Sequence, residues 1–263
     1  MSDFIEVCEK AARLGGRVLL DWADRFHVEE KGPADLVTEA DLASQEVIRQ
    51  FIRESYPAHK FLGEEDRPTP EQIKGILAME QPVWVVDPLD GTTNYAHRLP
   101  HFCVSVAVAH HQEVLAGAVF NPASDECFTA ARGNGAFLNG EAIWASSVEQ
   151  LSEALVVMSF PPRFRRESVD MDTLLCLLER AQSVRRSGSA ALNLCNLAAG
   201  RYDAYWARTT NAWDVAAGCC IASEAGAMVT ALDGSEFNLT QPAPMVAATE
   251  QLSRQLIDLL QLT

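Results

Sequence analysis

Two aspartates three positions apart, Asp87 and Asp90, stand in the segment DPLDGTTN, which directly follows the apolar run VWVV. Asp-Pro and Asp-Gly are turn-forming pairs, so an ordinary surface turn is one explanation of this segment. The other is a site for metal ions and phosphate, because a helix that starts after Gly91, at Thr92, would aim free backbone N–H groups at an anion. The choice depends on whether other carboxylates converge on this turn.

Three further acidic groups stand at the ends of apolar runs. Glu64 and Glu65 follow KFLG, and Asp214 lies in NAWDVAAG. Ligand sites of α/β proteins gather at strand and helix ends, and carboxylates that converge repel one another unless cations lie between them. A ligand set made only of oxygen favours magnesium, manganese or calcium over zinc or copper. Taken singly, each of these residues also fits a turn or a solvated helix cap.

The composition excludes several classes of partner. The chain has 263 residues, and its formal net charge is −15. Because an acidic surface repels nucleic acid and anionic lipid, we expect neither as a partner, and a phosphate site would need local positive charge that metal ions supply. The seven cysteines form no CxxC pair, which indicates reduced thiols in a cytoplasmic protein. We expect no signal peptide and no membrane span.

Hydrophobic spacing predicts the elements that must position the carboxylates. Apolar residues at intervals of three and four predict one helix from Phe4 to about Trp22 and another after Asp41. Short runs rich in Val, Ala and Phe, such as VWVV, FCVSVAVAHH and VLAGAVFN, predict mainly antiparallel strands. Later segments alternate strand with helix. Together they predict a layered α/β sandwich in one large domain or in two tightly joined lobes.

Three known motifs were compared with the sequence, two of them with the segment DPLDGTTN and one with the segment GNGAFLNG. A phosphatase of the haloacid dehalogenase type places its two aspartates two residues apart, whereas Asp87 and Asp90 lie three apart. An EF-hand loop needs a closing glutamate at its twelfth position, and no glutamate follows before Glu113. A dinucleotide-binding reading of GNGAFLNG lacks the third glycine at the required place. None of the three motifs matches its segment.

Six segments in order along nearly the whole chain resemble the signatures of the inositol monophosphatase family, which comprises magnesium-dependent, often lithium-sensitive phosphatases. The segments are DLVTEAD, LGEE, WVVDPLDGTTNYAHRLP, ARGNGAFLNG, RRSGSAALNLC and WDVAAG. GTTN favours the inositol-phosphatase branch over relatives that read GTK. The resemblance implies an αβαβα sandwich of the sugar-phosphatase type with mixed, largely antiparallel sheets. It also implies a single domain over residues 3–262, with two closely packed lobes that join near residue 150.

The resemblance also assigns roles to the acidic residues. Glu64, Asp87 and the backbone carbonyl of Leu89 would hold one Mg²⁺, and Asp87, Asp90 and Asp214 would hold a second. A third, weaker ion would lie near Glu64, which therefore also counts as catalytic. Two ions roughly 4 Å apart lower the pKa of the attacking water and neutralise charge in an in-line displacement, so no nucleophilic side chain is needed.

Substrate contacts follow from the same resemblance. The backbone amides of Gly91 and Thr92 would bind phosphate oxygens, and the Thr92 hydroxyl, supported by Asp41, would orient or deprotonate the attacking water. The residues expected to contact substrate hydroxyls are Asp90, Asp214, Gly188, Ser189 and Ala190. The family's inositol enzymes carry a glutamate seven residues before the WD aspartate, and here that position is Ala207.

These observations lead to one substrate hypothesis and two alternatives. We expect hydrolysis of a small phosphorylated polyol such as myo-inositol 1-phosphate, by a lithium-sensitive homodimer. Fructose 1,6-bisphosphate or another sugar phosphate is the nearest alternative, because Arg208 could attract a second phosphate or could simply lie on the surface. A regulatory binding protein that keeps the fold is the alternative of another class. The run RFRR (163–166) is expected to be a solvated loop.

Overall fold

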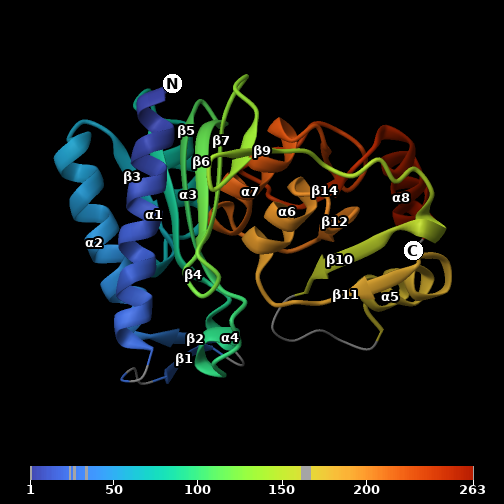
Figure 1. Cartoon of the computed structure of the whole chain (residues 1–263), viewed down its shortest axis with the longest axis horizontal. Coiled ribbons are helices and arrows are strands. Elements are labelled where there is room, and N and C mark those ends of the chain that lie inside the picture. The colour runs from blue at the N-terminus through green and yellow to red at the C-terminus, as the bar shows by residue number, and fades with distance from the viewer. Residues whose placement is uncertain (1, 24, 26–27, 33–34, 161–166, 263) are drawn as a thin grey trace.

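The computed structural model describes residues 2–23, 25, 28–32, 35–160 and 167–262, and its helices and sheets alternate in five layers (Figure 1). The helices are α1 (Ser2–Trp22), α2 (Glu39–Ser55), α3 (Pro70–Leu77), α4 (Thr92–Ala96), α5 (Val169–Arg180), α6 (Ala190–Ala198), α7 (Ala212–Glu224) and α8 (Glu250–Leu262). The layers are α1 with α2, a seven-stranded sheet, α6 with α7, a five-stranded sheet, and α5 with α8. This order confirms the predicted αβαβα sandwich. The run RFRR lies outside the described residues.

The outer pair α1 and α2 packs on the seven-stranded sheet. Cys8, Ala11 and Leu19 of α1 are fully buried on one face, as the apolar spacing of that segment requires. The prediction that the second helix follows Asp41 is wrong, because α2 already begins at Glu39. Thr38 caps the helix by accepting from the Ala40 amide, and its own amide donates to Asp41 Oδ2 at 2.8 Å. Asp41 is therefore a capping residue inside the first turn.

The seven-stranded sheet is almost entirely antiparallel. In sheet order its strands are β3 (Lys60–Gly63), β4 (Val83–Asp90), β5 (Cys103–His110), β6 (Glu113–Asn121), β7 (Glu126–Ala131), β8 (Ala136–Leu138) and β9 (Glu141–Ile143). Only β3 and β4 run parallel, with Gly63 opposite Val86. Because parallel neighbours end at the same edge, the residues after β3 lie beside the end of β4.

The five-stranded sheet mixes both directions. In sheet order its strands are β11 (Ser183–Arg185), β10 (Leu155–Ser159), β12 (Ala204–Ala207), β14 (Pro244–Ala247) and β13 (Met228–Ala231). Strand β10 is parallel to β11 and β12, and the remaining pairs are antiparallel. The chain passes from the first sheet to the second between Ile143 and Leu155, the segment that contains the predicted lobe junction. A separate hairpin consists of β1 (Val28–Gly32) and β2 (Asp35–Thr38).

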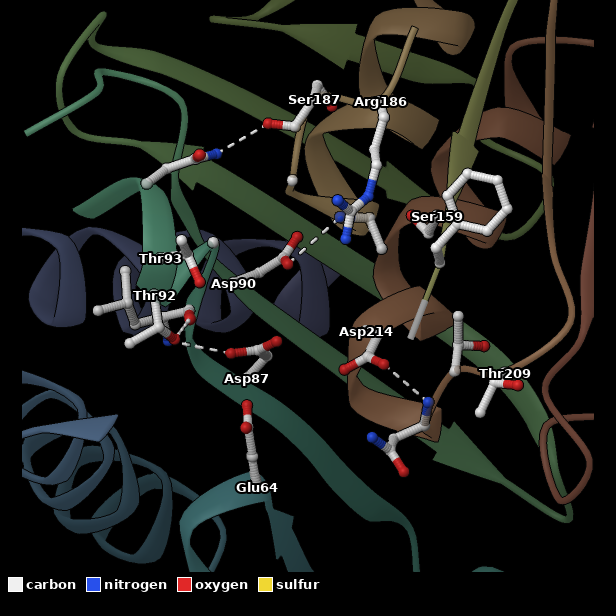
Figure 2. Close-up of a pocket in the computed structure, with 18 of the residues that line it drawn as sticks. Glu64, Asp87, Asp90, Thr92, Thr93, Ser159, Arg186, Ser187, Thr209 and Asp214 are labelled. Carbon is white, nitrogen blue, oxygen red and sulfur yellow. Dashed lines mark hydrogen bonds between the residues drawn. The ribbon is translucent and has the colours of Figure 1, made fainter. Parts of the chain in front are cut away.

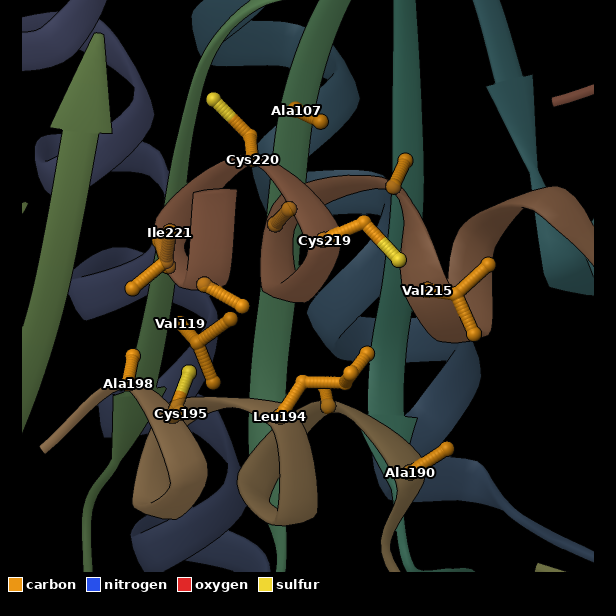
Figure 3. Packing of buried hydrophobic residues seen from close by; sticks show 14 of the residues in the cluster. Ala107, Val119, Ala190, Leu194, Cys195, Ala198, Val215, Cys219, Cys220 and Ile221 are labelled. Atoms are coloured by element: carbon orange, nitrogen blue, oxygen red, sulfur yellow. The ribbon is translucent and has the colours of Figure 1, made fainter. Parts of the chain in front are cut away.

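Small residues allow the middle layer to pack closely (Figure 3). A Cβ added at Gly117 of β6 would lie 2.8 Å from Ala217 Cα of α7, and one added at Gly218 would lie 2.7 Å from Leu194 Cβ of α6. Both glycines therefore let backbone or side-chain atoms of a neighbouring element approach without a clash. This packing fixes α7, the helix that carries Asp214, against the strands that end near Asp87.

Gly117→Ala is expected to destabilise the protein by about 1–3 kcal/mol, the usual cost of overpacking a core, because its Cβ meets backbone atoms that cannot rotate away. The urea midpoint measures the effect. Gly75→Ala in α3 is the matched control, because its Cβ meets nothing within 4 Å and alanine favours a helix by up to about 1 kcal/mol. Equal midpoints for wild type and Gly117→Ala would contradict the close packing.

Within the part of the chain that the structure describes, every helix is too short or too polar to cross a bilayer. Six of the seven cysteines are buried and Cys176 is half-buried. Burial raises the pKa of Cys103 and Cys195 well above the usual thiol range. These thiols therefore pack as small apolar residues.

Candidate active site

The segment DPLDGTTN begins inside β4 and ends in α4. Asp87 is 2% exposed, and its Oδ1 accepts from the Leu89 amide at 3.0 Å. Asp87 pairs with Ser105 and Asp90 with Cys103, so β4 uses one residue more than β5 over this stretch. Such a bulge redirects side chains and ends regular pairing. The acidic end of this apolar strand is therefore neither an ordinary surface turn nor a regular strand end.

Three carboxylates from distant parts of the chain converge at this edge of the sheet. Glu64 begins the short 3-10 turn Glu64–Asp66 that follows β3, Asp87 belongs to β4, and Asp214 lies in the first turn of α7. One oxygen from each lies within 4.8 Å of the oxygens of the other two (Figure 2). The parallel pairing of β3 with β4 brings the first two together, and the packing of α7 on the sheet brings the third.

The electrostatics of this trio suit a divalent cation. Burial raises the pKa of Asp87 well above its usual range, and the charges of Glu64, Asp90 and Asp214 raise it further. Burial likewise raises the pKa of Asp214, with a further increase from Glu64. Carboxylates that repel one another in a buried place, with only oxygen as donor, fit a hard cation such as Mg²⁺. The donor set therefore fits the predicted metal.

Asp90 has different partners from the trio. Its Oδ2 accepts from the Ser189 hydroxyl at 2.6 Å and from the Ala191 amide at 2.7 Å. Its Oδ1 accepts from the Ala190 amide at 3.2 Å. Burial raises the pKa of Asp90, and these hydrogen bonds lower it. Two residues predicted to contact substrate, Ser189 and Ala190, thus hold Asp90 at the start of α6, while Gly188 and Ala190 also line the cavity described below.

The Thr92 hydroxyl lies between Asp41 and the end of β4. It donates to Asp41 Oδ1 at 3.4 Å and to the Leu89 carbonyl at 3.1 Å. Thr38 fixes Asp41 through hydrogen bonds to Oδ2 from its hydroxyl at 2.6 Å and from its amide at 2.8 Å. Burial raises the pKa of Asp41 to about 7, although the bonds from Thr38 lower it. Asp41 can therefore gain or lose a proton near neutral pH.

Gly91 is required by the backbone at the start of α4. Its φ is +97°, in the left-handed region that favours glycine. A Cβ at this position would also lie 3.0 Å from the His101 carbonyl oxygen. The free amides at the start of α4 lie beside the carboxylates, as the sequence suggested.

The carboxylates and α4 form one wall of a cavity of about 610 Å³. Volumes of about 300–1,000 Å³ are typical of small-molecule sites. The opposite wall comes from the second sheet and the loops around it. Its residues include Ser159, Phe160, Arg186, Thr209 and Thr210.

A model of the inositol monophosphatase family matches residues 1–262. The chain belongs to this family. It is 42% identical to inositol monophosphatase 2 of Solanum lycopersicum over 95% of this chain and 94% of that protein. It is 38% identical to Nus factor SuhB of Pseudomonas aeruginosa over 89% of this chain and 88% of that protein. The solved inositol monophosphatase from Anabaena has a TM-score of 0.86 at 35% identity and covers 100% of this chain and 96% of its own.

Membership in the inositol monophosphatase family makes the chain a phosphoric monoester hydrolase. The family depends on metal ions, and the trio of Glu64, Asp87 and Asp214 is the acidic cluster that such an enzyme needs. The family acts on small phosphorylated molecules, and a cavity of about 610 Å³ accommodates molecules of that size.

Arg208 does neither of the two things considered from the sequence. Its Nε lies 3.0 Å from Asp170 Oδ1 of α5, its Nη2 donates to Thr173 at 3.3 Å, and its side chain is 28% exposed. It is not among the residues that line the cavity. Ala207, the preceding residue, is fully buried in β12. Because successive side chains of a strand point to opposite faces, Arg208 lies toward the outer helices.

Gln45 of α2 supports the Glu64 turn and was missed from the sequence. Its Oε1 accepts from the Glu65 amide at 3.0 Å, and its Nε2 donates to Asp66 Oδ1 at 3.2 Å. The side-chain amide occupies the space that a Cβ at Gly63 would need. A polar residue one helical turn after Asp41, on the same face of an amphipathic helix, was the available signal.

Gln45→Ala is expected to raise the Mg²⁺ concentration for half-maximal activity about tenfold or more, because residues that orient metal ligands typically contribute 10–100-fold in affinity. The turnover at saturating Mg²⁺ should change little. Calorimetric titration with Mg²⁺ checks the affinity without substrate. Gln50→Ala is the control, because the Gln50 side chain donates to exposed Glu54 on the same helix. An unchanged Mg²⁺ dependence would show that the turn needs no such support.

Proposed function

We propose that the chain hydrolyses a small phosphomonoester with Mg²⁺, and that myo-inositol 1-phosphate or a similar polyol phosphate is its substrate. The products are the free alcohol and inorganic phosphate. The observation that carries the proposal is the convergence of Glu64, Asp87 and Asp214 beside the start of α4. The inositol monophosphatases among its relatives support the polyol.

The residues assigned to the ions are Glu64, Asp87, the Leu89 carbonyl, Asp90 and Asp214. Two ions, with a third and weaker one near Glu64, are expected. When bound, they lower the pKa of water and neutralise charge on the entering and leaving oxygens. Asp90 would then contact an ion and also keep its hydrogen bonds to the start of α6.

The remaining steps belong to groups of the chain itself. The amides of Gly91 and Thr92 bind phosphate oxygens and hold the ester in line with the attacking water. The Thr92 hydroxyl orients or deprotonates that water, and Asp41, with a pKa of about 7, takes up the proton through its contact with Thr92. Because phosphate transfers directly to water, no covalent intermediate with the chain forms.

Steady-state kinetics test this proposal. With Mg²⁺ we expect turnover of myo-inositol 1-phosphate that EDTA abolishes and that millimolar lithium inhibits. A strong preference for fructose 1,6-bisphosphate would replace the inositol assignment with the sugar-phosphate alternative. Failure to hydrolyse either ester would refute the substrate class. The homodimer is a separate proposal, which light scattering on the purified protein tests.

A regulatory role is the second candidate function, and the observation that favours it is the 38% identity to Nus factor SuhB. The carboxylate trio is intact, so such a role would accompany catalysis rather than replace it. An Asp87→Asn strain separates the two functions. A phenotype that follows lost turnover supports the enzyme alone, whereas a cellular function that survives without turnover supports the binding role.

A further inference from the structure

One guanidinium group stands in the wall of the acidic cavity. Arg186 lines it together with the four carboxylates of Glu64, Asp87, Asp90 and Asp214, and it is the only positively charged side chain among the described residues of this lining. Figure 2 shows its side chain extending into the cavity, on the other side of Asp90 from Glu64 in that view. Arg186 belongs to the segment RRSGSAALNLC, but neither the roles assigned to the acidic residues nor the predicted substrate contacts include it.

The backbone on both sides of Arg186 is fixed. Strand β11 ends at Arg185, immediately before it, and the Ser187 carbonyl, immediately after it, accepts from Asn94 Nδ2 at 2.9 Å. The same Asn94 amide also donates to the His101 carbonyl at 2.7 Å, so α4 and the loop before α6 are joined at this point. The backbone that carries the Arg186 side chain is therefore held in a defined position beside α4.

Two consecutive arginines at this point behave differently. The Arg185 guanidinium turns back onto its own strand and donates to the Ser183 hydroxyl at 2.6 Å and to the Val184 carbonyl at 3.0 Å. The Arg186 guanidinium lies 5.9 Å from the centre of the Phe160 ring, which itself lines the cavity. An exposed cation–π contact of this kind contributes only about 0.5–1 kcal/mol, so it orients the group without neutralising it.

Within the described part of the chain, no carboxylate forms an ion pair with Arg186. Arg208 shows the opposite case, because Asp170 neutralises it. The charge balance of the loaded site then matters. Two divalent cations would cancel the four carboxylate charges, which leaves the Arg186 charge for the substrate. The reacting phosphate is assigned to the ions and to the amides of α4. The alcohol part of a polyol phosphate carries no further anionic group, whereas a second phosphate or carboxylate there can bind a guanidinium through two parallel hydrogen bonds.

We propose that Arg186 binds a second anionic group on the alcohol half of the substrate. The site would then accept phosphate esters whose alcohol carries a further phosphate or carboxylate, in addition to neutral polyol phosphates. This inference rests on the proposed phosphomonoesterase activity and refines its substrate class. It moves the second-anion contact from Arg208, where the sequence allowed it, to Arg186, which lines the cavity.

Two pairs of esters that differ in one group test the inference. Glycerol 2-phosphate and 2-phosphoglycerate differ by a carboxylate, and fructose 1-phosphate and fructose 1,6-bisphosphate differ by a phosphate. Arg186→Ala is expected to lower kcat/KM for the anionic member of a pair about 10–100-fold, the range of one or two charge-assisted hydrogen bonds, and for the neutral member less than about threefold. The pair that responds identifies the second anion as carboxylate or phosphate.

Two variants complete the design. Arg185→Ala removes the neighbouring charge, which faces its own strand. In each pair it should leave unchanged the ratio of kcat/KM for the anionic ester to kcat/KM for the neutral ester. Arg186→Lys keeps a positive charge but cannot form two parallel hydrogen bonds. Its ratio of kcat/KM for the anionic to the neutral ester should lie between those of Arg186→Ala and wild type. Circular dichroism and Tm establish that each variant is folded.

Three results would overturn the inference. Equal losses for both members of each pair would mean that Arg186 acts on the reacting phosphate or on the fold. Unchanged ratios in Arg186→Ala would mean that it is a solvated surface residue. A wild-type enzyme that hydrolyses myo-inositol 1-phosphate but neither anionic ester would overturn the inference alone, whereas one that hydrolyses neither myo-inositol 1-phosphate nor any of the four esters with Mg²⁺ would refute the proposed function itself.

Discussion

Asp87→Asn is expected to lower magnesium-dependent kcat by at least about 1,000-fold, which corresponds to about 4 kcal/mol of transition-state stabilisation. Asp87 is the most buried carboxylate of the trio and is assigned to both ions. Asparagine keeps an oxygen for the Leu89 amide, so the local turn should survive. What is lost is the negative charge that holds the cations, whose contribution is several kcal/mol.

The measurement is steady-state turnover over a range of Mg²⁺ concentrations, together with calorimetric titration of Mg²⁺ in the absence of substrate. Asp21→Asn, at an exposed position near the end of α1, is the matched control and should behave as wild type. If Asp87→Asn bound Mg²⁺ normally and retained more than about a tenth of the turnover, the assignment of the metal site to this trio would be wrong.

The same variant is expected to be more stable than wild type when metal is removed. In EDTA at pH 8 the wild-type protein holds Asp87 at 2% exposure beside two other carboxylates, where its ionised form is disfavoured. Each unit by which burial and these neighbours raise its pKa costs about 1.4 kcal/mol once the pH exceeds that pKa. For a chain of this size, 1 kcal/mol corresponds to about 2–4 °C in Tm. We therefore expect Asp87→Asn to gain several degrees.

The pH dependence has a definite sign. Because the pKa of Asp87 is raised in the folded state, the folded protein binds more protons than the unfolded chain between the unfolded and the folded pKa. The wild-type protein without metal therefore loses stability relative to Asp87→Asn as pH rises from about 4 through the folded pKa. At pH 4 the Tm difference should shrink, since both side chains are then neutral.

Magnesium should reverse the order of the two proteins. A cation that binds only the folded wild type stabilises it by about 2.7 kcal/mol at one hundred times its dissociation constant, while the asparagine variant gains little. Differential scanning calorimetry at pH 4 and pH 8, with EDTA or with Mg²⁺, gives all four comparisons. A variant that is less stable than wild type in EDTA at pH 8 would show that the carboxylates do not repel one another as the structure indicates.

Most helices and strands of this fold could be predicted from the local pattern of apolar residues. The spacing of three and four in the first helix and the Val-rich strands reflect burial of one face or both, which each short segment shows by itself. The start of α2 was misplaced because a capping box is a contact between Thr38 and Asp41. In the sequence that contact looks like part of a polar loop.

The outer contacts of the site were harder to predict than its ligands. Arg208 and Arg186 are both arginines close to a family signature, and no periodicity distinguishes them. The structure separates them because Arg208 forms an ion pair with Asp170 of α5, while Arg186 lines the cavity. Each arginine comes directly after the last residue of its strand, where the alternation of side chains along a strand no longer predicts the direction of a side chain.

The sequence by itself determined which chemistry is available. Carboxylates at the ends of apolar runs, a glycine before a helix start and the absence of a zinc motif are properties of short segments, and they indicated oxygen ligands and an anion before any fold was known. Only the tertiary structure decided that Glu64, Asp87 and Asp214 lie together, that Gln45 supports the Glu64 turn and that Arg186 lines the cavity. The reason is physical: contacts between residues 64, 87 and 214 depend on strand pairing and helix packing across the whole chain, and local residue patterns do not encode those distances.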